Sequence, residues 1–142
     1  MWLIYNAVDV ARIIINYCID IDKPINNITL VKLMYIIQYE YYIKFKRFVF
    51  NNDFTINNYG GYCEDVYREF RCNGILPIER QTIYKHVFYN KNTKRIQMVD
   101  LKVKDIKVLP SDYEYFKMIV HKYIDKDIFE LVDITKNMLF KA

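Results

Sequence analysis

The chain has 142 residues, of which 53% are hydrophobic, 17% aromatic and 27% charged, and its formal net charge is +4. A chain of this length and composition can bury a core of its own, so the composition excludes a disordered tail. The small positive charge is not enough to indicate a dedicated nucleic-acid-binding protein, because such proteins concentrate more Lys and Arg on one surface.

Two helices are predicted at the start of the chain, and each has an asparagine as its N-cap. Asn6 precedes apolar residues at helical spacing and predicts a helix that runs to about Asp20. Asn26 follows Pro24 and predicts a second helix that runs to about Phe45. Apolar and aromatic residues occupy nearly the whole circumference of this second helix between Leu30 and Phe45. That pattern is typical of a central helix that is buried on most sides.

The next segment contains the pair Gly60-Gly61, which we interpret as a tight turn at the end of a short extended stretch over residues 48–59. Two successive glycines indicate either a close approach of the backbone to another element or an exposed recognition loop, and the sequence leaves both open. A third helix is predicted from about Tyr62 to Cys72, with Asn73-Gly74 ending it.

The pattern changes to β-rich runs in the second half of the chain. Residues 83–89 and 95–99 flank a polar loop and predict a hairpin, and the pattern leaves open whether residues 101–109 add a third strand. The capping-box spacing of Ser111 with Glu114, and of Asp127 with Glu130, predicts two final helices. We therefore expect an α+β fold, a mainly helical single domain over residues 1–142 with a small antiparallel hairpin or three-stranded sheet before the C-terminal helices.

No pattern in the sequence indicates catalysis, a metal or a cofactor. His86 and His121 fall in different elements without a ligand partner at a metal-binding interval, and we expect both to be surface or hairpin residues. Nucleophile elbow, zinc-protease and phosphate-loop motifs are absent. We therefore predict a protein that is not an enzyme, with no catalytic residue, no bound metal and no cofactor.

Cysteine usage and the absence of a targeting segment bear on the compartment. The cysteines Cys18, Cys63 and Cys72 are odd in number and match neither a disulfide framework nor a zinc half-site. The first residues lack a signal-peptide pattern, and no apolar run reaches the ~18–20 residues needed to cross a bilayer. We expect a cytoplasmic protein without a membrane contact.

Tyrosines and basic residues form local concentrations that have two interpretations. The tyrosines of the second predicted helix could stack on bases or contact a protein, but packing in the core explains their positions more simply. They are Tyr35, Tyr39, Tyr41 and Tyr42. The basic clusters could contact nucleic acid, although cations at the end of a helix are already stabilising; they comprise Lys44, Lys46 and Arg47, and Lys91, Lys94 and Arg95.

The order of several short motifs resembles that of the SocA-like antitoxin family, also called the Panacea domain and related to a phage-associated protein group. These motifs are Tyr5 to Ala11, Pro24-Ile25, Leu30 to Gln38, Tyr59-Gly60, and Val66 to Phe70 with Gly74. The resemblance implies an antitoxin-type protein that neutralises a cognate toxin by direct contact and in some members delivers it to a protease.

The resemblance and the double glycine together give a candidate partner-binding set: Lys32, Tyr35, Gln38, Tyr59, Gly60, Gly61 and Tyr62. The leading hypothesis is a non-enzymatic inhibitor that binds a protein target, most simply a toxin. One alternative is a phage-encoded inhibitor of a bacterial defence nuclease of the anti-CRISPR type. Another is a DNA-binding autoregulator, whose affinity would fall steeply with salt.

Overall fold

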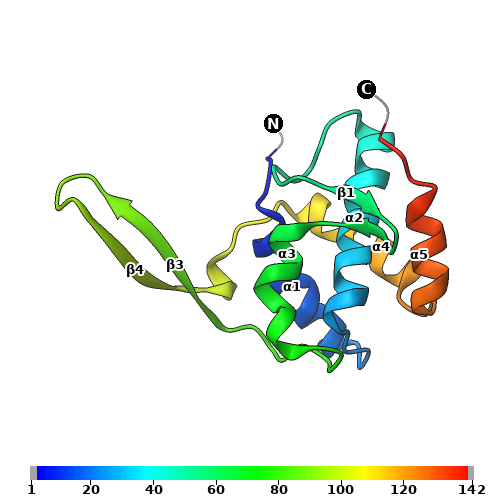
Figure 1. Cartoon of the computed structure of the whole chain (residues 1–142), viewed down its shortest axis with the longest axis horizontal. Helices are drawn as coiled ribbons and strands as arrows, with labels where there is room; N and C mark the ends of the chain where they lie inside the picture. The colour runs from blue at the N-terminus through cyan, green and yellow to red at the C-terminus, as the bar shows by residue number, and fades with distance from the viewer. Residues whose placement is uncertain (1–2, 141–142) are drawn as a thin grey trace.

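The computed structural model describes residues 3–140. Residues 1–2 and 141–142 of the expected single domain lie outside this description. Five α-helices and two separate two-stranded antiparallel sheets make up this part of the chain (Figure 1). The helices are α1 (Ala7–Asp20), α2 (Asn27–Phe45), α3 (Glu64–Phe70), α4 (Pro110–Tyr123) and α5 (Ile128–Lys136). The strands are β1 (Thr55–Asn57), β2 (Gly60–Tyr62), β3 (Ile83–Asn90) and β4 (Arg95–Lys102). The predicted α+β, mainly helical fold is confirmed.

The first two helices begin where the asparagine caps predict. The Asn6 side chain accepts a hydrogen bond from the amide of Val8 at 2.9 Å, and the Asn26 side chain accepts one from the amide of Thr29 at 3.0 Å. Each bond satisfies one of the N–H groups that have no partner within the helix. Both predicted helices are therefore confirmed.

Helix α2 is the central element of the core. Every residue from Leu30 to Gln38 is buried, on all sides of the helix. Helices α1, α3, α4 and α5 and strand β2 all pack against it. This arrangement confirms the prediction from its continuous apolar circumference, and it places two polar side chains, Lys32 and Gln38, inside the protein.

The two adjacent glycines lie in a strand, so the prediction of a turn at this pair is wrong. Gly60 and Gly61 belong to β2, which pairs with β1 in the register Asn57↔Gly60 and Ile56↔Gly61. The turn is one step earlier, at Asn58-Tyr59. Because β2 extends to Tyr62, helix α3 begins two residues later than predicted, and a 3-10 turn over Arg71–Asn73 follows it.

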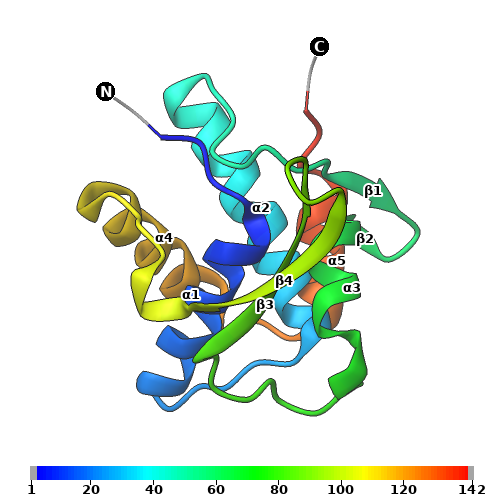
Figure 2. The same ribbon diagram turned by 90° about the vertical axis from the view of Figure 1, so that its left-hand side faces the viewer.

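Strands β3 and β4 form the predicted hairpin, which projects from the helical body as an arm (Figures 1 and 2). Of the two arrangements left open, the two-stranded hairpin is the one present, and residues 101–109 add no third strand to it. Strand β4 ends at Lys102, level with the first residue of β3. The chain then turns through a 3-10 segment over Val103–Asp105 and brings the buried side chain of Val103 back to the body.

One of the two predicted capping boxes is present. The Asp127 side chain accepts from the amide of Glu130 at 2.9 Å, and the Glu130 side chain accepts from the amide of Asp127. The box predicted for Ser111 is wrong, because Pro110 already occupies the first turn of α4 and Leu109 is its N-cap. Proline is favoured at this first position, since its missing N–H is not needed there.

The neighbouring Asp112 turns inward and joins three parts of the chain. It is buried and accepts hydrogen bonds from the hydroxyls of Tyr5 at 2.6 Å and Tyr41 at 2.9 Å. Burial, reinforced by these bonds, raises the pKa of both tyrosines to about 12. The carboxylate thus ties the N-terminal segment and α2 to the start of α4.

Candidate functional site

A cleft of about 610 Å³ opens between the start of α2, the β1–β2 hairpin, α3 and α5. Its lining is almost entirely apolar and aromatic: Ile28, Val31, Lys32, Asn57, Tyr59, Tyr62, Tyr67, Ile128, Phe129 and Val132. Two of its aromatic side chains are largely exposed to solvent, Tyr59 at 74% and Phe129 at 78%. Exposed aromatic rings around an apolar hollow are typical of a surface that binds a partner.

Lys32 is a buried lysine in the wall of this cleft. Its side chain comes from the most buried part of α2, and its ammonium donates a hydrogen bond to the carbonyl oxygen of Gly61 at 2.8 Å. No carboxylate forms an ion pair with it within residues 3–140. Burial lowers the pKa of Lys32 from 10.5 to about 8, because a low-dielectric surrounding disfavours the charged form.

The double glycine allows α5 and α2 to pack closely on both sides of β2. Gly60 has a φ of +92°, and a Cβ atom there would lie 2.5 Å from Oγ1 of Thr135. A Cβ atom on Gly61 would lie 2.3 Å from the ring of Tyr35. The amide of Gly61 donates to Oγ1 of Thr135 at 2.8 Å. Both glycines are buried, so close backbone approach is the interpretation that holds, and the exposed loop is at Tyr59 instead.

The remaining two residues of the candidate set lie deeper along α2. The ring of Tyr35 packs on Gly61, and its hydroxyl donates to the carbonyl of Met138 at 2.5 Å. Gln38 is buried, accepts from the amides of Val49 and Phe50, and donates to the carbonyl of Phe50. These contacts fix the chain after α2 and the segment after α5.

The structure thus divides the seven predicted residues into two groups. Lys32, Tyr59 and Tyr62 come together in the cleft. The other four support the cleft from behind or lie further along α2: Tyr35, Gln38, Gly60 and Gly61. Their role in binding stays a prediction.

Sequence reasoning missed the contribution of α5 to the cleft. Ile128, Phe129 and Val132 line it. Phe129 is two positions before buried Leu131, so on a helix of 3.6 residues per turn it lies on the opposite side from the buried face, and it is 78% exposed. This apolar residue away from the buried face was the available indication of a second apolar surface.

Several polar and aromatic groups outside the cleft make structural contacts. The Tyr17 hydroxyl and Nε2 of His121 share a hydrogen bond of 2.5 Å, and His86 stacks on Phe88 in β3. The tyrosines of α2 are buried or half-buried, with Tyr41 packed on Tyr115. Within residues 3–140 no group of three or more His, Cys, Asp or Glu side chains could hold a metal ion. None of the helices described there is long and apolar enough to span a bilayer.

Comparison with known protein families identifies the chain. The family model described as "Antitoxin SocA-like, Panacea domain" matches residues 30–138, a segment that begins in α2 and ends just after α5. It includes the double glycine, the arm and every residue of the cleft lining except Ile28. No curated protein and no solved structure matches the chain significantly. Because the matched segment covers well over half of the 142 residues, the chain belongs to the SocA-like antitoxin family and contains its Panacea domain.

Proposed function

We propose that this protein is a non-enzymatic antitoxin that neutralises a cognate toxin protein by direct contact through the cleft between α2, β1–β2, α3 and α5. Family membership supports the antitoxin role. The observation that carries the binding mode is the apolar cleft, on which Lys32, Tyr59 and Tyr62 converge from separate elements.

The shape and polarity of the cleft favour an apolar segment of the toxin as its occupant. Tyr59 and Phe129 stand exposed at its edge and would lose contact with water when a partner covers them. Aromatic anchors of this kind commonly carry a large share of the binding free energy at protein interfaces. The buried ammonium of Lys32 adds one polar group that can orient a carboxylate or carbonyl of the partner.

The state of the thiols is compatible with action in a reducing cytoplasm. Cys18 and Cys63 are buried and free, and Cys72 is exposed and free. Burial raises the pKa of Cys18 to about 12, which keeps this thiol protonated and unreactive.

The test uses the product of the reading frame next to the gene as the toxin. Expressed alone, that protein is expected to stop growth of the host; expressed with the antitoxin, it is expected to be tolerated and to co-purify with it in a fixed ratio. The Phe129→Asp variant is expected to abolish rescue, because it places a charge in the apolar cleft.

Met118→Asp is the matched control, since Met118 is also an apolar helical residue that is more than half exposed, but it lies on α4 away from the cleft. Rescue by Phe129→Asp as full as rescue by Met118→Asp would contradict the proposed role of the cleft. Absence of any complex with the unaltered protein would contradict the antitoxin function itself. A complex with a defence nuclease in place of a toxin would favour the anti-defence alternative.

A further inference from the structure

The β3–β4 arm is a preformed hairpin with a defined tip. Each strand has eight residues, which at a rise of about 3.3 Å per residue gives a length of about 25 Å. The side chain of Asn90 accepts hydrogen bonds from the amides of Asn92 and Thr93, and Lys94 adopts a positive φ of 58°. These contacts hold the tip in one conformation without a partner.

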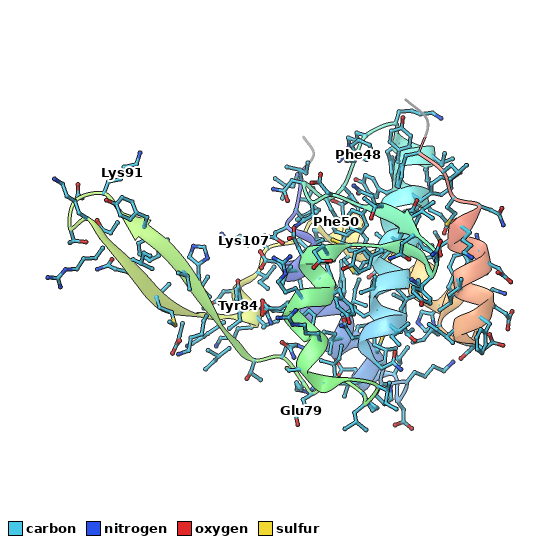
Figure 3. All side chains as sticks on the ribbon, viewed as in Figure 1. Phe48, Phe50, Glu79, Tyr84, Lys91 and Lys107 are labelled. Atoms are coloured by element: carbon cyan, nitrogen blue, oxygen red, sulfur yellow. The ribbon has the colours of Figure 1, made fainter. Side chains whose placement is uncertain are left out.

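The arm meets the helical body only near its base. Tyr84 packs under the guanidinium of Arg12, 4.5 Å from the centre of its ring, and Arg12 forms an ion pair with Glu69 of α3 at 2.9 Å. Figure 3 shows Tyr84 close to the body and Lys91 at the far tip, with side chains projecting into solvent on both sides of the ribbon. A two-stranded hairpin without further cover is only marginally stable in water.

One face of the arm carries an apolar patch in its outer half. The cross-strand pairs Val87↔Met98 and Tyr89↔Ile96 place four side chains on the same face, and each of the four is more than half exposed. An apolar patch on a projecting element, uncovered within the described residues, is typical of a binding surface. Both strands also have a free outer edge, since neither pairs with a further strand in that part of the chain.

The net positive charge of the chain is located on this arm. Residues 83–102 contain the cations Lys85, Lys91, Lys94, Arg95 and Lys102 against the single carboxylate Asp100. Their balance of +4 equals the net charge of the whole chain, so the rest of the chain has equal numbers of basic and acidic residues. Among residues 3–140, Lys85 is the one of these cations that forms an ion pair, with Asp100, which leaves a basic tip beside the apolar patch.

These features fit an acidic protein surface better than nucleic acid. Phosphates would meet the cations of the tip, but the patch of Val87, Tyr89, Ile96 and Met98 would stay in water. A protein that presents an apolar area bordered by Asp and Glu complements both.

The cleft alone is smaller than a standard protein interface, so a protein bound there would need further contact surface. Ten residues line the cleft, whereas a standard interface engages about 20–30 residues on each side. Helix α3 connects the two regions, because Tyr67 lines the cleft and Glu69 holds Arg12 beneath the base of the arm. In Figure 1 the arm and α5 lie at opposite ends of the longest axis, with α3 between them.

We infer that the β3–β4 arm is the second part of the toxin interface, and that the toxin binds it with an acidic surface around an apolar centre. This inference rests on the proposed antitoxin function. It adds the chemistry of the toxin surface. It also assigns a role to residues 83–102, which do not line the cleft.

The experiment follows hydrogen exchange of backbone amides in the antitoxin, free and in complex with the product of the adjacent reading frame. The amides of residues 83–102 are expected to exchange at least about tenfold more slowly in the complex, since those on the free edges would be covered. The double variant Lys91→Glu with Arg95→Glu is expected to slow association about tenfold or more at low salt, an effect that salt removes. Its matched control, Lys46→Glu with Lys107→Glu, makes the same change of net charge on exposed residues outside both the arm and the cleft.

A second variant tests the apolar patch. Ile96→Thr with Met98→Thr keeps residues that are compatible with a strand and removes exposed apolar surface, so it is expected to speed dissociation about tenfold. Unchanged arm exchange in a complex that does form would overturn the inference and leave the antitoxin function standing, whereas failure of the unaltered protein to form a complex would overturn both. Protection of the arm by a short duplex DNA and not by the toxin would also overturn it and make the arm a DNA-binding element.

Discussion

The buried lysine in the cleft makes the stability of the protein depend on pH in a defined direction. Burial lowers the pKa of Lys32 in the folded protein from 10.5 to about 8. Between these two values the unfolded chain binds more protons than the folded one, so the free energy of unfolding rises with pH in this window. Below about pH 8 both states carry the charge, and the folded state bears the full cost of burying it.

The size of the effect follows from the two pKa values. One pKa unit corresponds to about 1.4 kcal/mol, so Lys32 alone is expected to add about 2 kcal/mol to the free energy of unfolding between about pH 7 and about pH 9.5. Other groups oppose it at the upper end. The raised pKa of Cys18 removes stability above about pH 9, and the raised pKa values of Tyr5 and Tyr41 do so above about pH 10, because in each case the unfolded group ionises first.

Comparison with Lys32→Met isolates the lysine, because both proteins keep the same cysteines and tyrosines. Methionine has a similar length and no charge. The variant also loses the hydrogen bond to the Gly61 carbonyl, and this loss changes the free energy of unfolding by the same amount at every pH. Urea unfolding at several pH values is expected to show the unaltered protein gaining about 2 kcal/mol relative to the variant by about pH 9.5. A difference that stays constant within about 0.5 kcal/mol over this range would refute a lowered pKa for Lys32.

Two further predictions concern packing around the cleft and the buried carboxylate. Gly61→Ala is expected to destabilise the protein by about 3 kcal/mol or more, because its Cβ atom would lie 2.3 Å from the ring of Tyr35. Gly61 does not have a positive φ, so the expected loss comes from the clash, whereas Gly74→Ala, at a φ of +60° and with no atom within 4 Å, has only the cost of its backbone conformation; thermal unfolding compares the two variants. Tyr41→Phe is expected to cost about 1–3 kcal/mol, since one oxygen of buried Asp112 loses its donor. Denaturant unfolding of that variant at neutral pH checks this, and a loss below about 0.5 kcal/mol would contradict it.

The elements that the sequence predicts correctly are those with local indications. The caps at Asn6, Asn26 and Asp127 each act on an amide two or three residues away, so a short stretch of sequence contains the whole interaction. The hairpin at residues 83–102 likewise combines β-rich runs with a polar loop between them. Strand pairing and helix capping of this kind are decided within a few residues.

The errors arise where distant parts of the chain decide the outcome. Gly61 pairs with nearby Ile56, but its burial depends on Thr135, which accepts its amide from 74 residues later in the chain. Asp112 turns inward because Tyr5 and Tyr41 meet it there, 107 and 71 residues away. No local pattern contains those partners. No local pattern predicts the exposure of the arm either, because a β-rich run with apolar residues on both faces ordinarily packs on a core.

The candidate site was predictable in part. Family resemblance directed attention to Lys32 and Tyr59, and the double glycine to Tyr62; the fold brings the three together in one cleft. Tyr35 and Gln38 share the same motif, yet their side chains hold the backbone of neighbouring segments. A family motif contains both residues that line a surface and residues that hold the backbone in place, and only the three-dimensional arrangement separates the two.

Calorimetric titration of the purified protein into the product of the adjacent reading frame measures the proposed binding itself. We expect saturation at a fixed stoichiometry, with a negative heat-capacity change from the apolar surface that becomes buried in the cleft and on the arm. Substitution of Phe129 by Asp is expected to weaken this binding by about 2 kcal/mol or more, and substitution of Met118 by Asp is not. Absence of saturable heat from the unaltered protein in solutions where that product is folded and toxic would contradict the account.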